Sequence, residues 1–265
     1  MQTTDQPLSG KVAIVTGAGR GIGKAIARAY AKAGAAVCCA ARTEADLHET
    51  VQAIVAAGGQ GLVVPTDVTQ LAAVHKMVQV TVETFGGLDI LVINAGVQGE
   101  RRPVEDSHPE AWRTTLEINL LGAYYCAQAA IAALKQRGAG KIITVGSGIG
   151  HRGVVGSSDY ACAKAGLWML TRVLAQELWP YNISVNELIP GPVVTNRVGA
   201  PAAQRQSASG TTADETNIAD VFRGALGQSE WVKTPAEVVP LALFLATQPA
   251  IGPTAQSFSL MRRDN

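Results

Sequence analysis

Three side chains that could move a proton stand at fixed spacing in the middle of the chain. Ser147 is followed after twelve residues by Tyr160, and Tyr160 after three more by Lys164. Residues four apart share one face of a helix, so Lys164 would stand beside the Tyr160 phenol, where its charge lowers the tyrosine pKa from about 10. Such a tyrosine can exchange a proton with a substrate oxygen that the Ser147 hydroxyl holds. The alternative is an exposed pair on a helix surface.

A glycine-rich turn far upstream suits a second kind of chemistry. Residues 16–23 read TGAGRGIG and lie between an apolar run and a helical pattern. Glycine there permits a tight turn and a close approach of the backbone to a pyrophosphate, which the N-terminus of the next helix attracts. Any tight strand-to-helix turn can use glycine, but the flanking pattern favours a dinucleotide cradle. Its residues would be Gly17, Gly19, Arg20, Gly21, Ile22 and Gly23.

The end of the second apolar run indicates which dinucleotide would bind. NAD sites usually carry an acid there that accepts the ribose hydroxyls, and Ala41 cannot do so. Arg42, next to Thr43, could pair with a 2′-phosphate instead, and Arg20 could reach it from the glycine turn. We therefore predict NADP(H) in preference to NAD(H). Glu44 lies close in sequence, and two solvated surface arginines are the alternative.

Two further apolar runs end in residues suited to the rest of a dinucleotide. Asp67 could accept from the adenine amino group while Val68 packs on the ring. A simple helix cap is the alternative for Asp67. Asn94, Ala95 and Gly96 follow the next run, where small residues would let the ribose approach and the Asn94 amide would hold the adjacent backbone.

The apolar pattern of the chain predicts the scaffold for these residues. Short runs rich in Val and Ile, typical of strands buried on both faces of a parallel sheet, alternate with longer helical patterns. We expect strands at 12–17, 36–41, 61–66, 88–96, 141–147, 183–189 and about 255–261, and helices at 21–34, 43–58, 70–86, 109–137, 157–181 and 235–247. This rhythm predicts an α/β fold, a three-layer, doubly wound parallel sheet of the Rossmann type.

We expect residues 1–265 to form a single domain. Residues 8–195 would be the cofactor-binding and catalytic core, and 233–262 the C-terminal helix and last strand. Residues 196–232 would be a substrate lid, because this segment is long and includes a stretch rich in Ala, Ser and Thr. The last helix has the start of a capping box, with Thr234 as N-cap, Pro235 at N1 and Glu237 at N3.

Composition argues against several classes of function. The net charge is +1 and no Lys/Arg-rich run occurs, so we expect no nucleic-acid binding. The four cysteines form no cluster with metal-ligand spacing, so no metal is expected, and free thiols fit a cytoplasmic setting. We recognise no signal peptide and no membrane span, and expect a soluble protein.

Taken in order, the motifs resemble the short-chain dehydrogenase/reductase family, in its single-domain type of about 250 residues. The resemblance spans roughly residues 8–262 and rests on TGAGRGIG, INAG at 93–96, Asn119, Ser147, Tyr160–x3–Lys164 and Pro190–Gly191.

The resemblance implies roles for individual residues. Ser147, Tyr160, Lys164 and Asn119 would form a catalytic tetrad. Lys164 would also bind the nicotinamide ribose, and Asn119 would hold a water that links Lys164 to solvent. An ordinary helix-kinking amide is the alternative for Asn119. The nicotinamide carboxamide would lie against the turn formed by Pro190, Gly191, Val193 and Thr195.

The chain departs from the family pattern in two places. Near the C-terminus, Ala255 replaces a glycine, and Met261–Arg262–Arg263 replaces an Asp-Gly-Gly ending. That end often builds a subunit contact in the family. The resemblance implies a homotetramer or homodimer built on helices 109–137 and 157–181, but the unusual C-terminus leaves the exact assembly undetermined. Ser147 also stands between Gly146 and Gly148, where many relatives carry a neighbouring serine.

The residues that would contact the substrate are the least determined part of the site. His151 could tune a polar substrate group or lie on the surface, and Trp231 could line the pocket or pack the lid. The expected pocket walls are Val97, Gln98, Ile149, His151, Val154, Val155, Trp231 and segment 196–230.

The sequence thus predicts an oxidoreductase that moves a hydride between NADP(H) and a ketone or secondary alcohol, with Tyr160 as general acid/base. Apolar ketones of small to medium size, or their alcohols, are the expected substrates. Two alternatives stay open, because function lives in the site and not in the fold. One is a redox-neutral or imine-directed enzyme, such as an epimerase, dehydratase or imine reductase. The other is a non-catalytic NADP(H) sensor.

Overall fold

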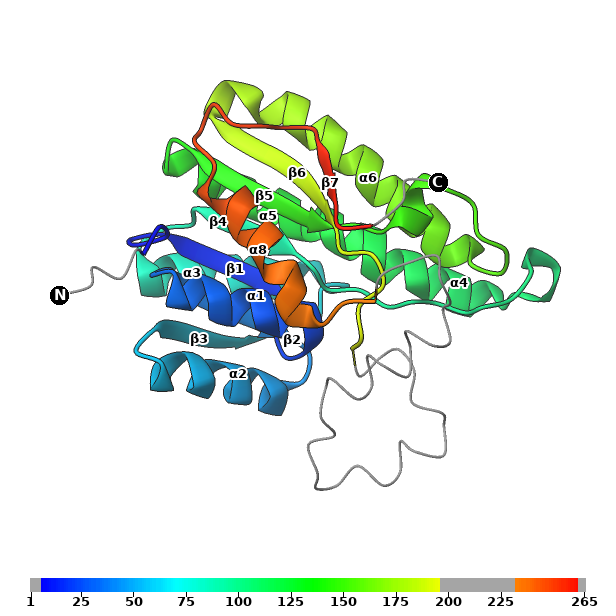
Figure 1. Cartoon of the computed structure of the whole chain (residues 1–265), viewed down its shortest axis with the longest axis horizontal. Helices are drawn as coiled ribbons and strands as arrows, with labels where there is room; N and C mark the ends of the chain where they lie inside the picture. The colour runs from blue at the N-terminus through cyan, green and yellow to red at the C-terminus, as the bar shows by residue number, and fades with distance from the viewer. Residues whose placement is uncertain (1–5, 196–231, 262–265) are drawn as a thin grey trace.

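A single parallel sheet forms the centre of the protein, and the computed structural model describes residues 6–195 and 232–261 (Figure 1). The strand order across the sheet is β3-β2-β1-β4-β5-β6-β7, and every adjacent pair is parallel. This confirms the doubly wound Rossmann-type sheet. The strands are β1 (Val12–Thr16), β2 (Ala36–Ala41), β3 (Gln60–Pro65), β4 (Ile90–Ile93), β5 (Gly140–Val145), β6 (Ile183–Ile189) and β7 (Ser257–Ser259).

Helices cover both faces of the sheet and form two separate apolar cores. Side chains from α1, α2 and α8 pack on one face, and side chains from α3, α5 and α6 pack on the other. The helices are α1 (Gly21–Lys32), α2 (Glu44–Ala56), α3 (Leu71–Phe85), α4 (Pro109–Leu116), α5 (Gly122–Gln136), α6 (Ser158–Leu178) and α8 (Pro235–Thr247). Four short turns, η1 (Val104–Asp106), η2 (Glu117–Leu121), η3 (Gly148–His151) and η4 (Trp179–Tyr181), complete the described elements.

The expected helix at 109–137 is not continuous. It divides into α4 and α5, and η2 between them is a π-helical turn that contains Asn119. Asn119 Nδ2 donates to the Thr115 carbonyl at 2.9 Å, the acceptor that an unbroken α-helix offers to the Asn119 backbone N–H. The side chain therefore competes with the helix ladder, which accounts for the local change in its spacing.

Several strands are shorter than the sequence pattern indicates, whereas β2 and β6 have the expected bounds. The run at 88–96 contributes only Ile90–Ile93 to β4, so the residues from Asn94 to Gly96 lie beyond the strand. The last strand is likewise shorter than expected, at Ser257–Ser259. Because β4 ends at Ile93, the backbone from Asn94 to Gly96 leaves the sheet and can contact a ligand at the carboxyl ends of the strands.

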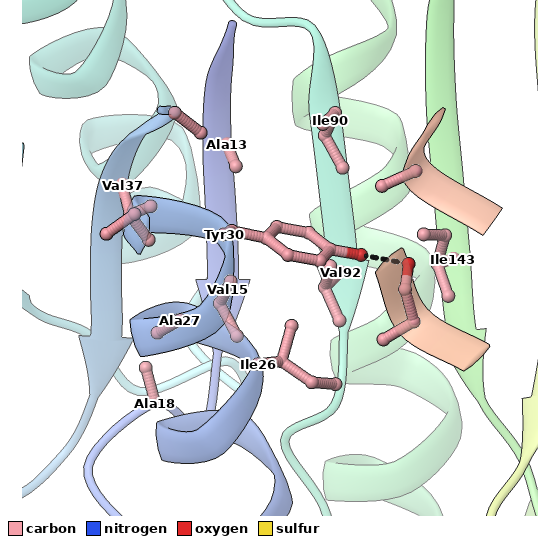
Figure 2. Packing of buried hydrophobic residues seen from close by; sticks show 14 of the residues in the cluster. Ala13, Val15, Ala18, Ile26, Ala27, Tyr30, Val37, Ile90, Val92 and Ile143 are labelled. Atoms are coloured by element: carbon pink, nitrogen blue, oxygen red, sulfur yellow. Dashed lines mark hydrogen bonds between the residues drawn. The ribbon is translucent and has the colours of Figure 1, made fainter. Parts of the chain in front are cut away.

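A buried tyrosine joins the first and last helices of the chain. Tyr30 of α1 is fully buried, and its hydroxyl donates to the Ala242 carbonyl of α8 at 2.8 Å. Figure 2 shows the ring lying between α1 and β4, near Val92, with the hydroxyl turned toward α8. A buried hydroxyl without a partner costs about 1–3 kcal/mol, so this bond is what allows a phenol in the core. Burial also raises the pKa of Tyr30 far above its usual value.

The start of α8 confirms the expected capping box. Thr234 donates from both its backbone N–H and its hydroxyl to Glu237 Oε2, at 2.6 and 3.0 Å, and Pro235 occupies the first turn. Among the helices in the described ranges, none combines the length and apolar character needed to cross a membrane.

Ala255 carries backbone strain at the position where the family pattern has glycine. Its φ is 59°, in the left-handed region that is unfavourable for a residue with a Cβ. We expect Ala255→Gly to raise the free energy of unfolding by about 0.5–1 kcal/mol, because relief of about 1–2 kcal/mol of strain exceeds the entropic penalty of glycine. Urea unfolding of the two proteins measures this difference. Ala250→Gly, at a position without a positive φ, is the control and should not stabilise. A less stable Ala255→Gly protein would contradict the expectation.

Candidate active site

The glycine turn after β1 has a shape that side chains would obstruct. Gly17 has a φ of 68°, and a Cβ there would lie 2.7 Å from Asn94 Nδ2. At Gly23, the first turn of α1 packs so closely on the Gly17 carbonyl that a Cβ would collide with it. The backbone at the N-terminus of α1 is therefore bare, as a pyrophosphate cradle requires.

Residues after β4 hold the glycine turn in place. The Asn94 amide donates to the Thr16 carbonyl at 2.8 Å and to the Gly17 carbonyl at 3.4 Å. In return, Thr16 Oγ1 accepts from the backbone N–H groups of Asn94 and Ala95, at 2.9 and 3.0 Å. The Asn94 amide thus makes the backbone contact expected from the sequence, and Thr16, which sequence reasoning missed, completes the connection.

A pocket opens between these two segments, where the strand order of the sheet reverses. Open α/β sheets bind ligands at this place. Six residues expected to hold the cofactor line it, together with Val97, expected at the substrate. The lining is Gly17, Ala41, Arg42, Thr66, Asp67, Val68, Ala95, Gly96, Val97 and Ile118. Thr66 and Ile118 were not expected there. The bare glycine backbone and the small Ala41, Ala95 and Gly96 leave room for the adenosine half of a dinucleotide, so the residues present fit that group.

The charged side chains around this pocket are of both signs. Arg20 and Arg42 are exposed and lie in the glycine turn and at the end of β2. Asp46, in the first turn of α2, packs against the glycine turn: a Cβ on Gly19 would be 2.8 Å from Asp46 Cβ and 3.6 Å from Oδ2. Glu44 is turned to His48, 3.5 Å away. Two arginines could bind a phosphate here, and Asp46 is the acid that opposes them.

Asp67 is not the N-cap of the following helix, because that position belongs to Gln70. Its Oδ1 accepts from the backbone N–H and the hydroxyl of Thr69, at 3.0 and 2.8 Å. This local turn fixes the carboxylate at the pocket and leaves Oδ2 for a ligand. Thr43 occupies the N-cap position of α2 and makes no side-chain cap bond.

Lys164 lies beside the Tyr160 ring near the carboxyl end of β5, and Ser147 follows that strand. Lys164 of α6 is buried, and its Nζ donates to the Val145 carbonyl at 2.7 Å and lies 5.8 Å from the centre of the Tyr160 ring. Ser147 Oγ accepts from Ile149 N at 3.3 Å, which leaves its hydroxyl proton to donate elsewhere. η3 packs so closely on α6 that a Cβ on Gly150 would lie 2.8 Å from Lys164 Cβ.

The electrostatic state of Lys164 results from two opposing effects. Burial lowers the pKa of Lys164 to about 8, since the surroundings solvate the ammonium poorly, and the charge of Glu187 acts in the opposite direction. A lysine with this pKa holds a positive charge at neutral pH, and that charge stands beside the Tyr160 phenol.

Asn119 fixes the loop that leads away from β4. Its Oδ1 accepts from Val97 N at 3.2 Å, and its Nδ2 donates to the carbonyls of Val97 and Thr115, at 3.0 and 2.9 Å. Oδ1 also approaches Gly96, where a Cβ would be 2.5 Å away. Both amide hydrogens and one lone pair are used, so the side chain can offer a water molecule one remaining acceptor site.

The turn after β6 lies against the glycine cradle. Val194 N donates to the Lys233 carbonyl at 2.8 Å, and Lys233 N donates to the Pro192 carbonyl at 3.0 Å. A Cβ on Gly21 would lie 3.1 Å from Thr195 Cγ2, so the end of this turn contacts the start of α1. Gly191 has a φ of 67°, and this conformation favours the glycine in the Pro190–Gly191 pair.

Comparison with known proteins identifies the family. Residues 11–206 match the family model described as short chain dehydrogenase. The chain belongs to the short-chain dehydrogenase/reductase family. It is 37% identical over 245 residues to the short-chain reductase protein NovJ of Streptomyces niveus, which covers 92% of this chain and 90% of that protein.

Solved structures in the family have the same fold. The crystal structure of a short-chain type dehydrogenase/reductase from Mycobacterium marinum matches with a TM-score of 0.80 and 32% identity, over 96% of this chain and 95% of that one. An NAD+-bound xylitol dehydrogenase matches with a TM-score of 0.82 and 27% identity, over 96% and 98%. This short-chain dehydrogenase is accordingly an oxidoreductase for alcohol or carbonyl groups that uses a nicotinamide cofactor, NAD or NADP.

The residues expected at the substrate are spread over several environments. Val97 is half-buried at the pocket, Ile149 is half-buried in η3, and Gln98 is exposed. Val154 and Val155 are 39% and 96% exposed. His151 donates to Glu187, as described below. Trp231 and segment 196–230 lie outside the residues that the structure describes.

Two buried acids close to the catalytic residues of this dehydrogenase were missed by sequence reasoning. Asp159, directly before Tyr160, accepts from Tyr160 N at 2.7 Å through Oδ1, and from Glu100 N and Thr115 Oγ1 at 3.0 Å through Oδ2. Glu187 lies in β6. The one available signal was Glu187 itself, an acid inside the apolar run ISVNELI. Asp159 resembles an ordinary residue of the first helical turn, so its burial was not predictable.

Asp159 makes the α6 N-terminus sensitive to substitution. Asp159→Ala removes the acceptor of the Tyr160 and Glu100 N–H groups, while the Thr115 hydroxyl keeps the Ala111 carbonyl as an acceptor. We expect it to lower the free energy of unfolding by about 2–4 kcal/mol. Asp159→Asn retains one acceptor oxygen and should lose less than half of that. Chemical unfolding of the three proteins measures both differences, and equal stability of Asp159→Ala and wild type would contradict the account.

Proposed function

We propose that the protein is a carbonyl reductase or alcohol dehydrogenase that uses NADP(H), with Tyr160 as general acid and base. The observation that carries this proposal is the cluster beyond β5. There the buried Lys164 ammonium lies 5.8 Å from the centre of the Tyr160 ring and donates to the Val145 carbonyl, two residues before Ser147. Apolar ketones of small to medium size, or their secondary alcohols, are the proposed substrates.

Each residue of the cluster has a distinct role in the proposed reaction. The Ser147 hydroxyl donates to the substrate oxygen and orients it. Tyr160 gives its phenolic proton to that oxygen in reduction, or accepts a proton from the hydroxyl in oxidation. The Lys164 charge stabilises the tyrosinate, and its remaining N–H groups are donors for ribose hydroxyls. Hydride transfer to or from the carbonyl carbon is the chemistry that a bound nicotinamide supplies.

The remaining expected residues would hold the cofactor along the sheet edge. The glycine turn would accept the pyrophosphate, Asp67 and Val68 the adenine, and Asn94 to Gly96 the adjacent ribose. The turn from Pro190 to Thr195 would pass the carboxamide. Asn119, beyond its bonds to Val97 and Thr115, would hold the relay water at its remaining acceptor site.

The proton-transfer role is tested by Tyr160→Phe, which removes only the phenolic oxygen. We expect turnover to fall about 10²–10⁴-fold, the usual contribution of a general acid or base. NADPH binding, measured by nicotinamide fluorescence, should stay within about twofold because the ring and Lys164 remain. Tyr181→Phe, at an exposed tyrosine of η4, is the matched control and should keep full turnover. Full turnover by Tyr160→Phe would remove the assignment.

The NADP(H) preference rests on Arg42 and is opposed by Asp46. Arg42→Asp should weaken NADPH binding by about 1–3 kcal/mol, since a charge-assisted hydrogen bond is lost and repulsion is added. NADH binding should change little, because NADH lacks the 2′-phosphate. Arg28→Asp, on the exposed side of α1, changes the net charge equally and is the control for long-range electrostatics. Unchanged NADPH affinity in Arg42→Asp would mean that Arg42 does not bind the phosphate.

Exposed apolar side chains support the proposal of a homodimer or homotetramer. They lie on η2, α5 and α6, at the elements where family members often pair, and are between 43% and 49% exposed. These residues are Leu121, Tyr124, Met169 and Val173. A second copy of the chain would cover them, as patches of this kind mark interaction sites.

The reaction itself is tested by following NADPH and NADH oxidation over a panel of ketones, diketones, quinones and cyclic imines. Turnover of ketones with NADPH preferred supports the proposal. Tight cofactor binding without turnover of any carbonyl would favour the redox-neutral, imine-directed or sensor alternatives.

A further inference from the structure

A carboxylate lies buried behind the catalytic cluster. Glu187 of β6 is almost completely buried. Its Oε2 accepts from His151 Nε2 at 2.8 Å and from Ser257 Oγ at 2.5 Å. Its Oε1 has no hydrogen-bond partner within the described part of the chain. Burying a carboxylate is costly unless it is paired, and a carboxylate that leaves one oxygen unpaired is more costly still. Its position therefore calls for a functional reason.

The structure makes room for this carboxylate at one particular place. A Cβ on Gly146 would collide with Glu187 Oε1, so the glycine before Ser147 is a direct complement of Glu187. Gly146 lies between Ser147 and Val145, and the Val145 carbonyl accepts the bond from Lys164 Nζ. The unpaired oxygen is thus adjacent to the short stretch of backbone that holds both Lys164 and Ser147.

His151 holds the carboxylate from the other side. It ends η3, the turn that begins directly after Ser147, and its ring packs on Trp168 of α6 with the ring centres 5.0 Å apart. The His151 side chain is 27% exposed, whereas that of Glu187 is 1% exposed. The pair therefore ties the Ser147 turn to β6 and keeps water away from the carboxylate.

Glu187 is the charge that acts on Lys164 in these surroundings. Tyr160 on α6 and the Glu187–His151 pair face Lys164, and the effects on the pKa of Lys164 are its burial and the opposing charge of Glu187. Other charged groups on α6 and on the elements packed against it make no described bond to Lys164. On α6 they are Asp159 and Arg172, which bond elsewhere. On the neighbouring elements they are the Glu110–Arg113 pair of α4, Glu117 of η2 and Lys141 of β5.

We propose that Glu187 is a positioning residue, whose carboxylate, held by His151 and Ser257, keeps the buried Lys164 ammonium charged. The inference rests on the proposed function for the importance of that charge, but the charge state itself can be measured without substrate or cofactor. The direction of the effect follows from electrostatics. Without Glu187, only burial acts on Lys164, so its pKa falls and the proton leaves at a lower pH.

The test compares wild type with Glu187→Gln, which keeps shape and removes the charge. Lysine labelled with ¹³C at Cε is titrated by NMR in the neutral and alkaline range, and Lys164→Met assigns the resonance. We expect the Lys164 transition to move to lower pH by about one unit or more in Glu187→Gln, as the loss of a close charge predicts. An unchanged transition overturns the proposal.

Two controls separate charge from structure. Asp89→Asn removes another buried, ion-paired carboxylate, at the opposite edge of the sheet, and should leave the Lys164 transition in place. Ser257→Ala removes one donor to Glu187 Oε2 and leaves its charge, and should also leave the transition nearly in place. An equal shift in Asp89→Asn would mean that general loosening and not Glu187 sets the charge of Lys164, which would also overturn the proposal.

The pH profile of turnover provides the second readout. In Glu187→Gln the alkaline limb of kcat should move to lower pH in parallel with the Lys164 transition, while kcat at pH values well below both transitions changes less. A shifted resonance in a protein that turns over no carbonyl would contradict the proposed reaction and leave the role of Glu187 supported. If Glu187→Gln does not fold, Gly146→Ala/Glu187→Ala, which fills the vacated space with a methyl group, replaces it under the same expectations.

Discussion

Parallel strands cannot be joined by a tight turn, and this constraint determines where chemistry can take place in the protein. Each strand must be followed by a crossover, here a helix, before the chain can enter the sheet again in the same direction. All carboxyl ends therefore gather at one edge of the sheet. Gly17, Arg42, Asp67, Asn94 and Ser147 follow five different strands and lie at the carboxyl ends of the strands for this reason.

The amino ends of the strands, on the opposite side of the sheet, have a structural role. Asp89 there accepts from the backbone of Val12 and from the guanidinium of Arg137, and so ties the amino ends of the strands to the end of α5. Both edges contain a nearly inaccessible carboxylate, but Asp89 is saturated with donors and Glu187 is not. Asp89 connects two segments of the fold and has a structural role. Glu187 leaves one carboxylate oxygen unpaired among the described residues, and its charge acts on Lys164. Burying such a carboxylate costs more free energy than burying a fully paired one, and a purely structural residue does not need it.

The sequence allows prediction of what depends on local pattern and leaves out what depends on long-range contacts. Runs of Val and Ile predict the buried strands. The repeated glycines of TGAGRGIG predict the turn after β1, because that backbone conformation needs residues without a Cβ. The interruption of the helix at Asn119 was not predictable in the same way, because it depends on a loop after β4 that offers Val97 to the same amide.

Glu187 was visible as an acid in an apolar strand, but its partner His151 and its complement Gly146 come together only when β5, β6 and η3 assemble. Ala41 and Arg42 indicate a phosphate, yet Asp46 of the next helix packs against Gly19 of the glycine turn, a contact that is not apparent in the sequence.

The bond between Tyr30 and Ala242 has a consequence for how the chain is made. The two residues are 212 positions apart, so the ribosome completes α1 long before it synthesises the helix that covers it. Until α8 emerges, the apolar face of α1 and one face of the central strands have no cover, and native contacts of this separation form slowly. During this interval the apolar surface that α8 covers in the native protein is exposed, and exposed apolar surface of this kind favours aggregation. The docking of α8 therefore completes the apolar core on its face of the sheet.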